Sequence, residues 1–224
     1  MLSMRTVALA VSSLVVASAA LASRSGLNNV PNADTSAPRT GVVQLYSAFG
    51  EDRQTSFLTG VRSGLKLGEQ KFEAGLDSRW APGADVVAFL NAKYAFPRRV
   101  GGPAFALGIA GLAPESRDRA RLGEPQSYAV ATLPFDGARL HAGYAVQRRN
   151  NAAFVGFDRA WQVAARPLTL RADAIQIQDR AQWLASIGFT YRASKLVGLE
   201  LWRSFPTERG RSYTTAKLGL NFAY

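Results

Sequence analysis

The chain has 224 residues and a mass of 24.1 kDa, which is enough for one sizeable domain. It contains 27 Lys and Arg against 16 Asp and Glu, a net charge of +11, and no cysteine, so neither a lipoprotein anchor nor a disulfide framework is available. The basic residues are spread along the chain rather than clustered, which argues against nucleic-acid binding.

The first 22 residues predict a cleaved signal peptide. Residues 1–5 are positively charged, residues 7–16 are apolar except for two serines, and Ala20-Leu21-Ala22 is a small-x-small cleavage site. The apolar stretch is too short to span a bilayer as a helix, and no later segment approaches eighteen consecutive apolar residues. Residues 23–39 are rich in Ser, Asn and Pro without periodicity and predict a flexible periplasmic lead-in.

From residue 40 to residue 224 the chain alternates apolar and polar residues in twelve segments. Each segment is close to the length of about 9 to 11 residues that a tilted strand needs to cross a bilayer, and the number is even, as in single-chain bacterial barrels. We therefore predict an all-β, closed, antiparallel up-and-down transmembrane barrel. The expected strands are residues 40–49, 55–67, 70–80, 85–96, 103–113, 127–134, 138–147, 152–164, 168–176, 181–192, 196–205 and 211–224.

The connections between these segments divide into a short and a long set. The expected short turns are Gly68-Glu69, residues 97–102, residues 135–137, Arg166-Pro167 and residues 193–195. The two longest connections, residues 114–126 and 206–212, fall in the other set. Because short turns are periplasmic in bacterial barrels, both chain termini are expected in the periplasm.

The last strand has an apolar face that ends on the final residue. Leu218, Leu220, Phe222 and Tyr224 alternate along this face. The strand resembles the terminal strand of bacterial outer-membrane β-barrels, where an aromatic last residue with apolar residues two, four and six places before it is the assembly signal. The resemblance implies the barrel-assembly machinery as a partner and the outer membrane, with its lipid and lipopolysaccharide, as the location.

Aromatic residues near the segment ends predict the girdles that membrane barrels carry at both interfaces. The expected periplasmic girdle comprises Tyr94, Phe96, Phe105, Phe189, Tyr191, Phe222 and Tyr224, and the expected outer girdle Trp80, Tyr128 and Trp183.

Two segments fit the alternation poorly. Segment 152–164 would point Arg159 toward lipid together with Phe157 and Trp161, at a cost of about 2 to 4 kcal/mol at mid-membrane. A bulge or a register shift of one residue would relieve that cost. Segment 40–49 is apolar on both faces, so its orientation stays open.

Many charged residues are predicted to face the lumen. The basic ones are Arg62, Lys66, Lys71, Arg79, Lys93, Arg139, Arg171, Arg192 and Lys217, and the acidic ones are Glu73, Asp77, Asp85, Asp158, Asp173 and Glu200. They are consistent with a salt-bridged interior that fills a narrow barrel, because unpaired buried charges are costly. The other interpretation of these charges is a cationic channel whose field draws small acidic solutes.

Catalysis has little support in the sequence. The only histidine, His141, is predicted to face the lumen, whereas outer-membrane lipases and deacylases place a His and a Ser together on the barrel surface. Glu73 and Asp77 lie on one strand among Lys71 and Arg79, where ion pairing is the expected role. One histidine and no cysteine leave zinc without its usual ligands, and no cofactor motif is present.

We therefore interpret the sequence as a non-enzymatic outer-membrane barrel, either a small-solute, anion-preferring channel or a structural surface barrel. The alternatives are an outer-membrane lipid-modifying enzyme and a soluble periplasmic ligand-binding barrel of eight to ten strands. A further alternative is a barrel module of an exopolysaccharide export system, because the fragment Leu27-Asn28-Asn29-Val30-Pro31-Asn32-Ala33-Asp34 resembles an Asn-x-Pro-x-Ala element of barrels linked to exopolysaccharide secretion.

Overall fold

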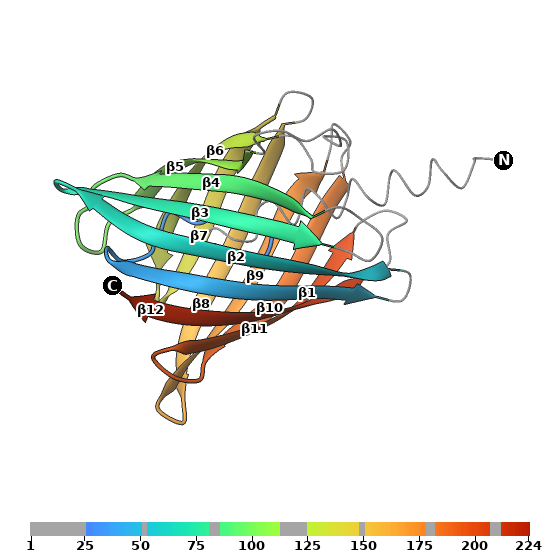
Figure 1. Cartoon of the computed structure of the whole chain (residues 1–224). Helices are drawn as coiled ribbons and strands as arrows, with labels where there is room; N and C mark the ends of the chain where they lie inside the picture. Colours follow the sequence, from blue (N-terminus) through green and yellow to red (C-terminus); the bar gives the residue numbers. More distant parts are fainter. Residues whose placement is uncertain are drawn as a thin grey trace.

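Twelve antiparallel strands form one closed barrel (Figure 1). The computed structural model describes residues 26–50, 53–80, 86–112, 125–147, 151–177, 182–206 and 212–224. The strands are β1 (Thr40–Gly50), β2 (Arg53–Leu67), β3 (Gln70–Trp80), β4 (Val87–Ala95), β5 (Ala104–Leu112), β6 (Gln126–Phe135), β7 (Ala138–Val146), β8 (Ala152–Val163), β9 (Arg166–Ile177), β10 (Gln182–Arg192), β11 (Val197–Pro206) and β12 (Tyr213–Ala223).

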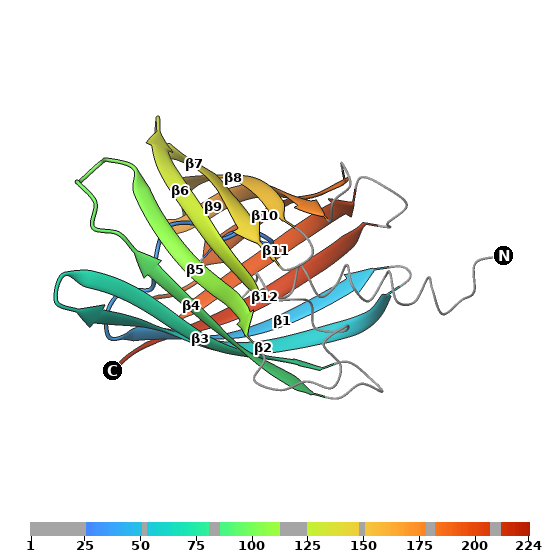
Figure 2. The ribbon, with the colours of Figure 1, turned by 90° about the horizontal axis from the view of Figure 1, so that it is seen from above.

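Each strand pairs with its neighbours in sequence, and β1 pairs with β12 to close the ring (Figure 2). The closing register places Thr40 opposite Ala223 and Tyr46 opposite Lys217. Closure satisfies the backbone groups that an open sheet edge would expose to hydrocarbon. The predicted fold class and strand number are confirmed.

The tight turns gather at one end of the barrel, which we call the short-turn end, together with the start of β1 and Tyr224. The pairs Leu67 with Gln70 and Phe135 with Ala138 close two-residue turns there. The expected turn at Arg166-Pro167 is wrong: β9 already begins at Arg166, which pairs with Val163. The turn is Ala164-Ala165, with φ of 48° and 59°. Proline suggested a turn here, but a two-residue hairpin needs positive φ, which proline cannot adopt.

Replacing Ala164-Ala165 with Asn-Gly is expected to stabilise the barrel by about 1 to 2 kcal/mol, because each alanine is held in the left-handed region at a cost of about 1 kcal/mol. The measurement is the denaturation midpoint in detergent. Gly137→Ala is the matched opposite: Gly137 has a φ of 72° and open space around an added Cβ, so only the backbone conformation would be penalised. A stabilised Gly137→Ala variant would contradict the argument.

The outer face of the barrel is an apolar belt. Leu45, Leu76, Leu140, Val155 and Leu201 are all between 41% and 50% exposed, on β1, β3, β7, β8 and β11 around the ring. On β1, Val42, Gln44 and Tyr46 are buried inside while Val43 and Leu45 face outward, which settles the orientation that the sequence left open. A closed cylinder with this belt suits a bilayer. None of the described residues forms a helix long and apolar enough to cross a membrane.

Arg159 does face outward, and neither a bulge nor a shifted register relieves it. The pairing of β8 with β7 and β9 is continuous through Arg159. Arg159 lies opposite Ala138, the first residue after a short turn, and its guanidinium stacks 5.6 Å from the ring centre of Trp161. At this depth near the interface, an outward arginine costs only about 0 to 1 kcal/mol.

Outward-facing aromatic side chains form a girdle around the barrel at the short-turn end. Phe105, Phe189 and Phe222 are exposed, and the Tyr94 ring lies 4.8 Å from that of Phe96, centre to centre. The expectation for Tyr128 is wrong, because this side chain is 3% exposed and points into the lumen. An aromatic residue near a strand end can lie at the membrane interface or inside the barrel. The alternation of inward and outward side chains along β6 turns Tyr128 inward. The side chain of Trp80 lies outside the described residues.

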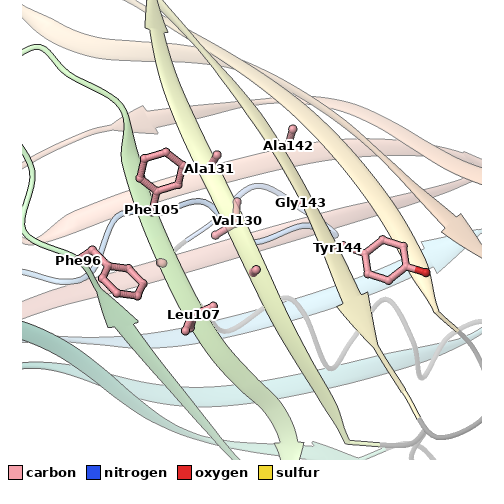
Figure 3. Close-up of a pocket in the computed structure, with 10 residues that line it drawn as sticks. Phe96, Phe105, Leu107, Val130, Ala131, Ala142, Gly143 and Tyr144 are labelled. Carbon is pink, nitrogen blue, oxygen red and sulfur yellow. The ribbon is translucent and has the colours of Figure 1, made fainter.

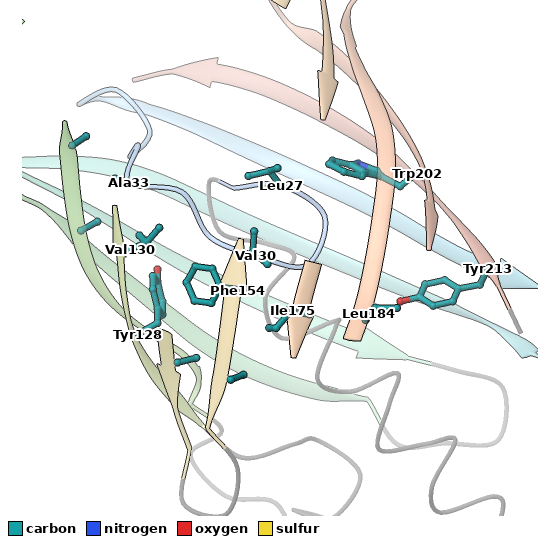
Figure 4. Close-up of a cluster of buried hydrophobic side chains, with 14 residues drawn as sticks. Leu27, Val30, Ala33, Tyr128, Val130, Phe154, Ile175, Leu184, Trp202 and Tyr213 are labelled. Carbon is teal, nitrogen blue, oxygen red and sulfur yellow. The ribbon is translucent and has the colours of Figure 1, made fainter. Parts of the chain in front are cut away.

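Residues 26–38, which we call the inner segment, lie inside the barrel rather than forming a flexible periplasmic lead-in (Figure 4). Leu27, Val30 and Ala33 are at most 3% exposed. The segment begins with a turn in which Gly26 bridges Pro31 and the amide of Leu27 donates to the carbonyl of Val30. It ends at the short-turn end, where Pro38 bridges Gly64 before β1 begins. Residues 1–25, with the expected signal peptide, lie outside the described residues.

The apolar side chains of the inner segment pack on an apolar inner wall. Figure 4 shows Leu27 and Val30 among Phe154, Ile175 and Trp202, which come from β8, β9 and β11. The lumen is therefore not polar throughout. Alternation predicts only that inward positions avoid lipid, so it does not distinguish a wet interior from a packed one.

Candidate solute site in the lumen

The tip of the inner segment is held by polar side chains of β9, β10 and β11. Asp173 accepts hydrogen bonds from the backbone amide of Asn29 (2.8 Å) and from its side-chain amide (2.9 Å). The Asn29 and Asn28 amides also donate to Ser186 and Ser204, at 2.6 and 3.2 Å. Each of these groups is buried, so the hydrogen bonds replace those that the groups would make with water.

The middle of the segment is held by a network on β6, β7 and β8. The amide of Ala33 donates to the Thr132 hydroxyl (2.9 Å), which in turn contacts His141 Nδ1 at 2.9 Å. His141 Nε2 lies 3.3 Å from Asp158 Oδ2. The Arg139 guanidinium then bridges Asp158, in a two-pronged contact at 2.8 and 2.6 Å, and Asp34 of the segment at 2.5 Å.

The end of the segment is held by β3 and β4. The amide and hydroxyl of Ser36 both donate to Glu73 Oε2 at 2.8 Å. Lys93, 2% exposed, donates to the carbonyls of Asn32 and Asp34, and its ammonium lies 3.8 Å from Glu73. The inner segment is thus fixed at three places around the wall.

A basic cavity of about 190 Å³ remains between the inner segment and the wall. Its charged lining consists of Arg62, Arg139, Arg171, Arg192 and Lys217 against Asp34 and Glu200. The rest of its lining is Gly26, Leu27, Asn32, Val42, Gln44, Thr190, Gly198, Gly219 and Asn221. The cavity lies toward the short-turn end, because Arg192 and Asn221 stand near strand ends there.

Glu200 links the cations on one wall of this cavity. Its carboxylate lies 3.8 Å from Arg171 and 3.9 Å from Lys217, and accepts a hydrogen bond from the Trp202 indole at 3.0 Å. The Lys217 ammonium also lies 5.1 Å from the ring centre of Tyr46. One carboxylate shared by two cations leaves positive charge available to an anion.

The structure brings only part of the predicted lumen set to this cavity. Arg62, Arg139, Arg171, Arg192, Lys217 and Glu200 line it, whereas Lys93, Glu73, Asp158 and Asp173 bind the inner segment or its network. Asp77 is fully buried and accepts from Asn91 at 2.6 Å. Lys71 is exposed, Lys66 pairs with Glu69 at the rim (3.6 Å), and Arg79 is half-buried away from the cavity. Asp85 lies outside the described residues.

Sequence reasoning missed the residues of the inner segment. Asp34, Asn28 and Asn29 were assigned to an unstructured lead-in, yet they pair with lumen side chains. The available signal was local: Leu27, Val30 and Ala33 recur every three residues within a stretch of turn-forming asparagines.

A separate groove of about 620 Å³ lies on the outside of β5, β6 and β7 (Figure 3). Phe96, Phe105, Leu107 and Tyr144 border a floor of small residues that includes Ala131. The groove has no charged lining residue and lies within the apolar belt on the outer face, so it is not a candidate binding site for a polar solute. The described residues also hold no group of three or more His, Asp or Glu that could bind a metal ion.

The fold is that of outer-membrane porin barrels. The KdgM porin superposes with a TM-score of 0.57 at 8% identity, over 82% of this chain and 99% of that one. The same porin in complex with disordered oligogalacturonate gives 0.55, and the NanC porin gives 0.55 at 9% identity, over 81% and 100% of the two chains. No family model and no curated protein sequence matches this chain. At these identities the likeness is one of fold.

Proposed function

We propose that the protein is an outer-membrane channel for small acidic solutes, in which the inner segment sets the width of the passage. The observation that carries the proposal is the excess of cations around the lumen cavity, where five basic side chains face two carboxylates. A cationic, partly enclosed space concentrates anions and lowers the barrier to their entry.

The proposal includes the setting of the channel. The short-turn end and Tyr224 face the periplasm, and the apolar belt contacts outer-membrane lipid, with lipopolysaccharide on the opposite side. Leu218, Leu220 and Phe222 of β12, with Tyr224 directly after it, form an outward row that presents the assembly signal to the barrel-assembly machinery; Leu220, Phe222 and Tyr224 are exposed.

A structural surface barrel is the second candidate, favoured by one observation. The inner segment and the apolar wall fill much of the lumen, as expected of a barrel whose interior serves stability. The lipid-modifying alternative gains no support from His141, which is 2% exposed and lies inside, beside the inner segment.

Arg192→Glu is expected to reduce the preference for anions in planar bilayers. Replacing a positive by a negative charge about 8 Å from a permeating ion changes that ion's energy by about 1 kcal/mol in water, or about fivefold in local concentration before salt screening. The measurement is the reversal potential across a salt gradient. Arg192 is exposed at the cavity mouth, so the variant is expected to assemble.

Lys195→Glu is the matched control, because Lys195 is exposed at the same end but does not line the cavity. It is expected to leave the reversal potential nearly unchanged. An unmodified protein that inserts into bilayers and conducts nothing would overturn the channel and favour the structural barrel.

A further inference from the structure

Two buried polar atoms beside the cavity lack a hydrogen-bond partner among the described residues. They are Nε of Arg171 and the hydroxyl of Thr190. Both residues line the basic cavity. Arg171 uses its Nη1 for the Gly26 carbonyl (3.2 Å), so the Nε edge of the same guanidinium is left over. Buried polar atoms are nearly always paired, and an orphan donor next to a cavity indicates a missing partner.

The register places these two residues on the inward face of neighbouring strands, two positions apart. Arg171 on β9 is opposite Gly188 on β10, and Thr190 lies two residues further along β10 on the same inward face. Thr190 is in turn opposite Glu200, and Glu200 opposite Lys217. An acceptor between β9 and β10 would therefore face a guanidinium edge and a hydroxyl, with the Lys217 ammonium beyond Glu200 in the same cavity.

Glycines leave the room that such a ligand needs. Gly198 and Gly219 face each other across β11 and β12 and line the cavity. A Cβ added at Gly198 would meet no atom within 4 Å, and one at Gly219 would meet only ordinary contacts beginning at 3.6 Å. Larger residues would fit the strands here, so the missing side chains keep the cavity open rather than relieve crowding.

We propose that this part of the cavity is a binding site for one small hydroxylated carboxylate. The carboxylate accepts from Arg171 Nε near Lys217, and a hydroxyl of the solute pairs with Thr190. This inference rests on the proposed function, because it specifies which class of acidic solute the channel takes. A carboxylate accepts from a guanidinium edge, and a hydroxyl of the same solute can both donate to and accept from the Thr190 hydroxyl, whereas the charged oxygens of an inorganic anion only accept.

The test is a titration of the detergent-solubilised full chain by saturation-transfer NMR, with D-gluconate as the probe and sorbitol as its uncharged counterpart. Saturable gluconate binding without sorbitol binding is expected. Thr190→Val should weaken gluconate about tenfold, as for the loss of one hydrogen bond to a charged ligand. Because the variant removes an unsatisfied buried hydroxyl, it should be at least as stable as the unmodified protein.

Gly198→Leu should abolish binding by filling the cavity, while Ala216→Leu, on the outward face of β12, should leave it unchanged. Equal affinity in Thr190→Val, equal binding of inorganic phosphate, or no gluconate binding would overturn the site. None of these outcomes touches the channel, because conductance and anion preference are measured separately in the same variants. A chain that binds gluconate but does not conduct would keep the site and overturn the channel.

Discussion

A variant lacking residues 26–36 should form the same barrel and conduct ions several times better than the intact chain. The deletion removes the inner segment, whose Leu27 and Val30 are packed against the apolar wall and whose backbone crosses the lumen. Its partners Asp173, Glu73 and Lys93 would then be exposed to water in a wider lumen, where their charges are solvated rather than stranded. The measurement is single-channel conductance in planar bilayers, with gel mobility before and after heating as the check on folding.

A single introduced thiol provides the control for this deletion. The chain has no cysteine, so Asn29→Cys places one thiol at the buried tip of the inner segment. It should resist a membrane-permeant maleimide in the folded protein and react once the protein is denatured. Rapid labelling without denaturant, or identical conductance with and without the segment, would show that residues 26–36 do not limit the passage.

Arg139→Met is expected to cost about 3 kcal/mol of stability. Arg139 makes two hydrogen bonds to Asp158 and one to Asp34. The Asp158 side chain is 5% exposed, so its charge would be left nearly buried and bound only by His141. We place the loss at the low end of the range for broken buried pairs, because the Arg139 side chain is itself 33% exposed. The measurement is the denaturant midpoint in detergent.

The second-site change Asp158→Asn should restore much of the stability lost in Arg139→Met, since it removes the stranded charge. Arg159→Met is the matched control: it is the neighbour of Asp158 on β8, but it faces outward near the interface. It should change stability little. A loss in Arg159→Met as large as that in Arg139→Met would mean that charge removal in general, not the Asp158 pair, is responsible.

The barrel was predictable because lipid imposes a rule at every second residue. Phe72, Ala74 and Leu76 against Glu73 and Asp77 allow one register, and a slip by one would turn the carboxylates toward lipid. Turn positions were predictable where a residue favours positive φ, as Gly68 and Asp136-Gly137 do. Ala164-Ala165 gives no such signal, and its conformation is imposed by the strands on either side.

The candidate site was predictable in its charges but not in its composition. Parity assigned Arg171, Lys217 and Glu200 to the lumen, yet it could not distinguish cavity-lining charges from those that bind a segment, such as Asp173. That distinction depends on where residues 26–38 lie, which is decided by contacts with strands far along the chain. The alternation of residues along a strand indicates which way each side chain points, but it carries no information about contacts with distant segments.

Those distant contacts also order the events of folding. The inner segment is made first, but the partners of its hydrogen bonds lie between 37 and 176 residues later in the chain. It can settle only after β9, β10 and β11 have formed the wall that receives Asn28 and Asn29. The inner segment also continues directly into β1, which can complete its pairing only when β12, the last strand, has been synthesised. Docking of the inner segment in the lumen and pairing of β1 with β12 are therefore both late steps in folding, and both involve adjoining residues. Until then the lumen of the folding barrel does not contain the docked segment.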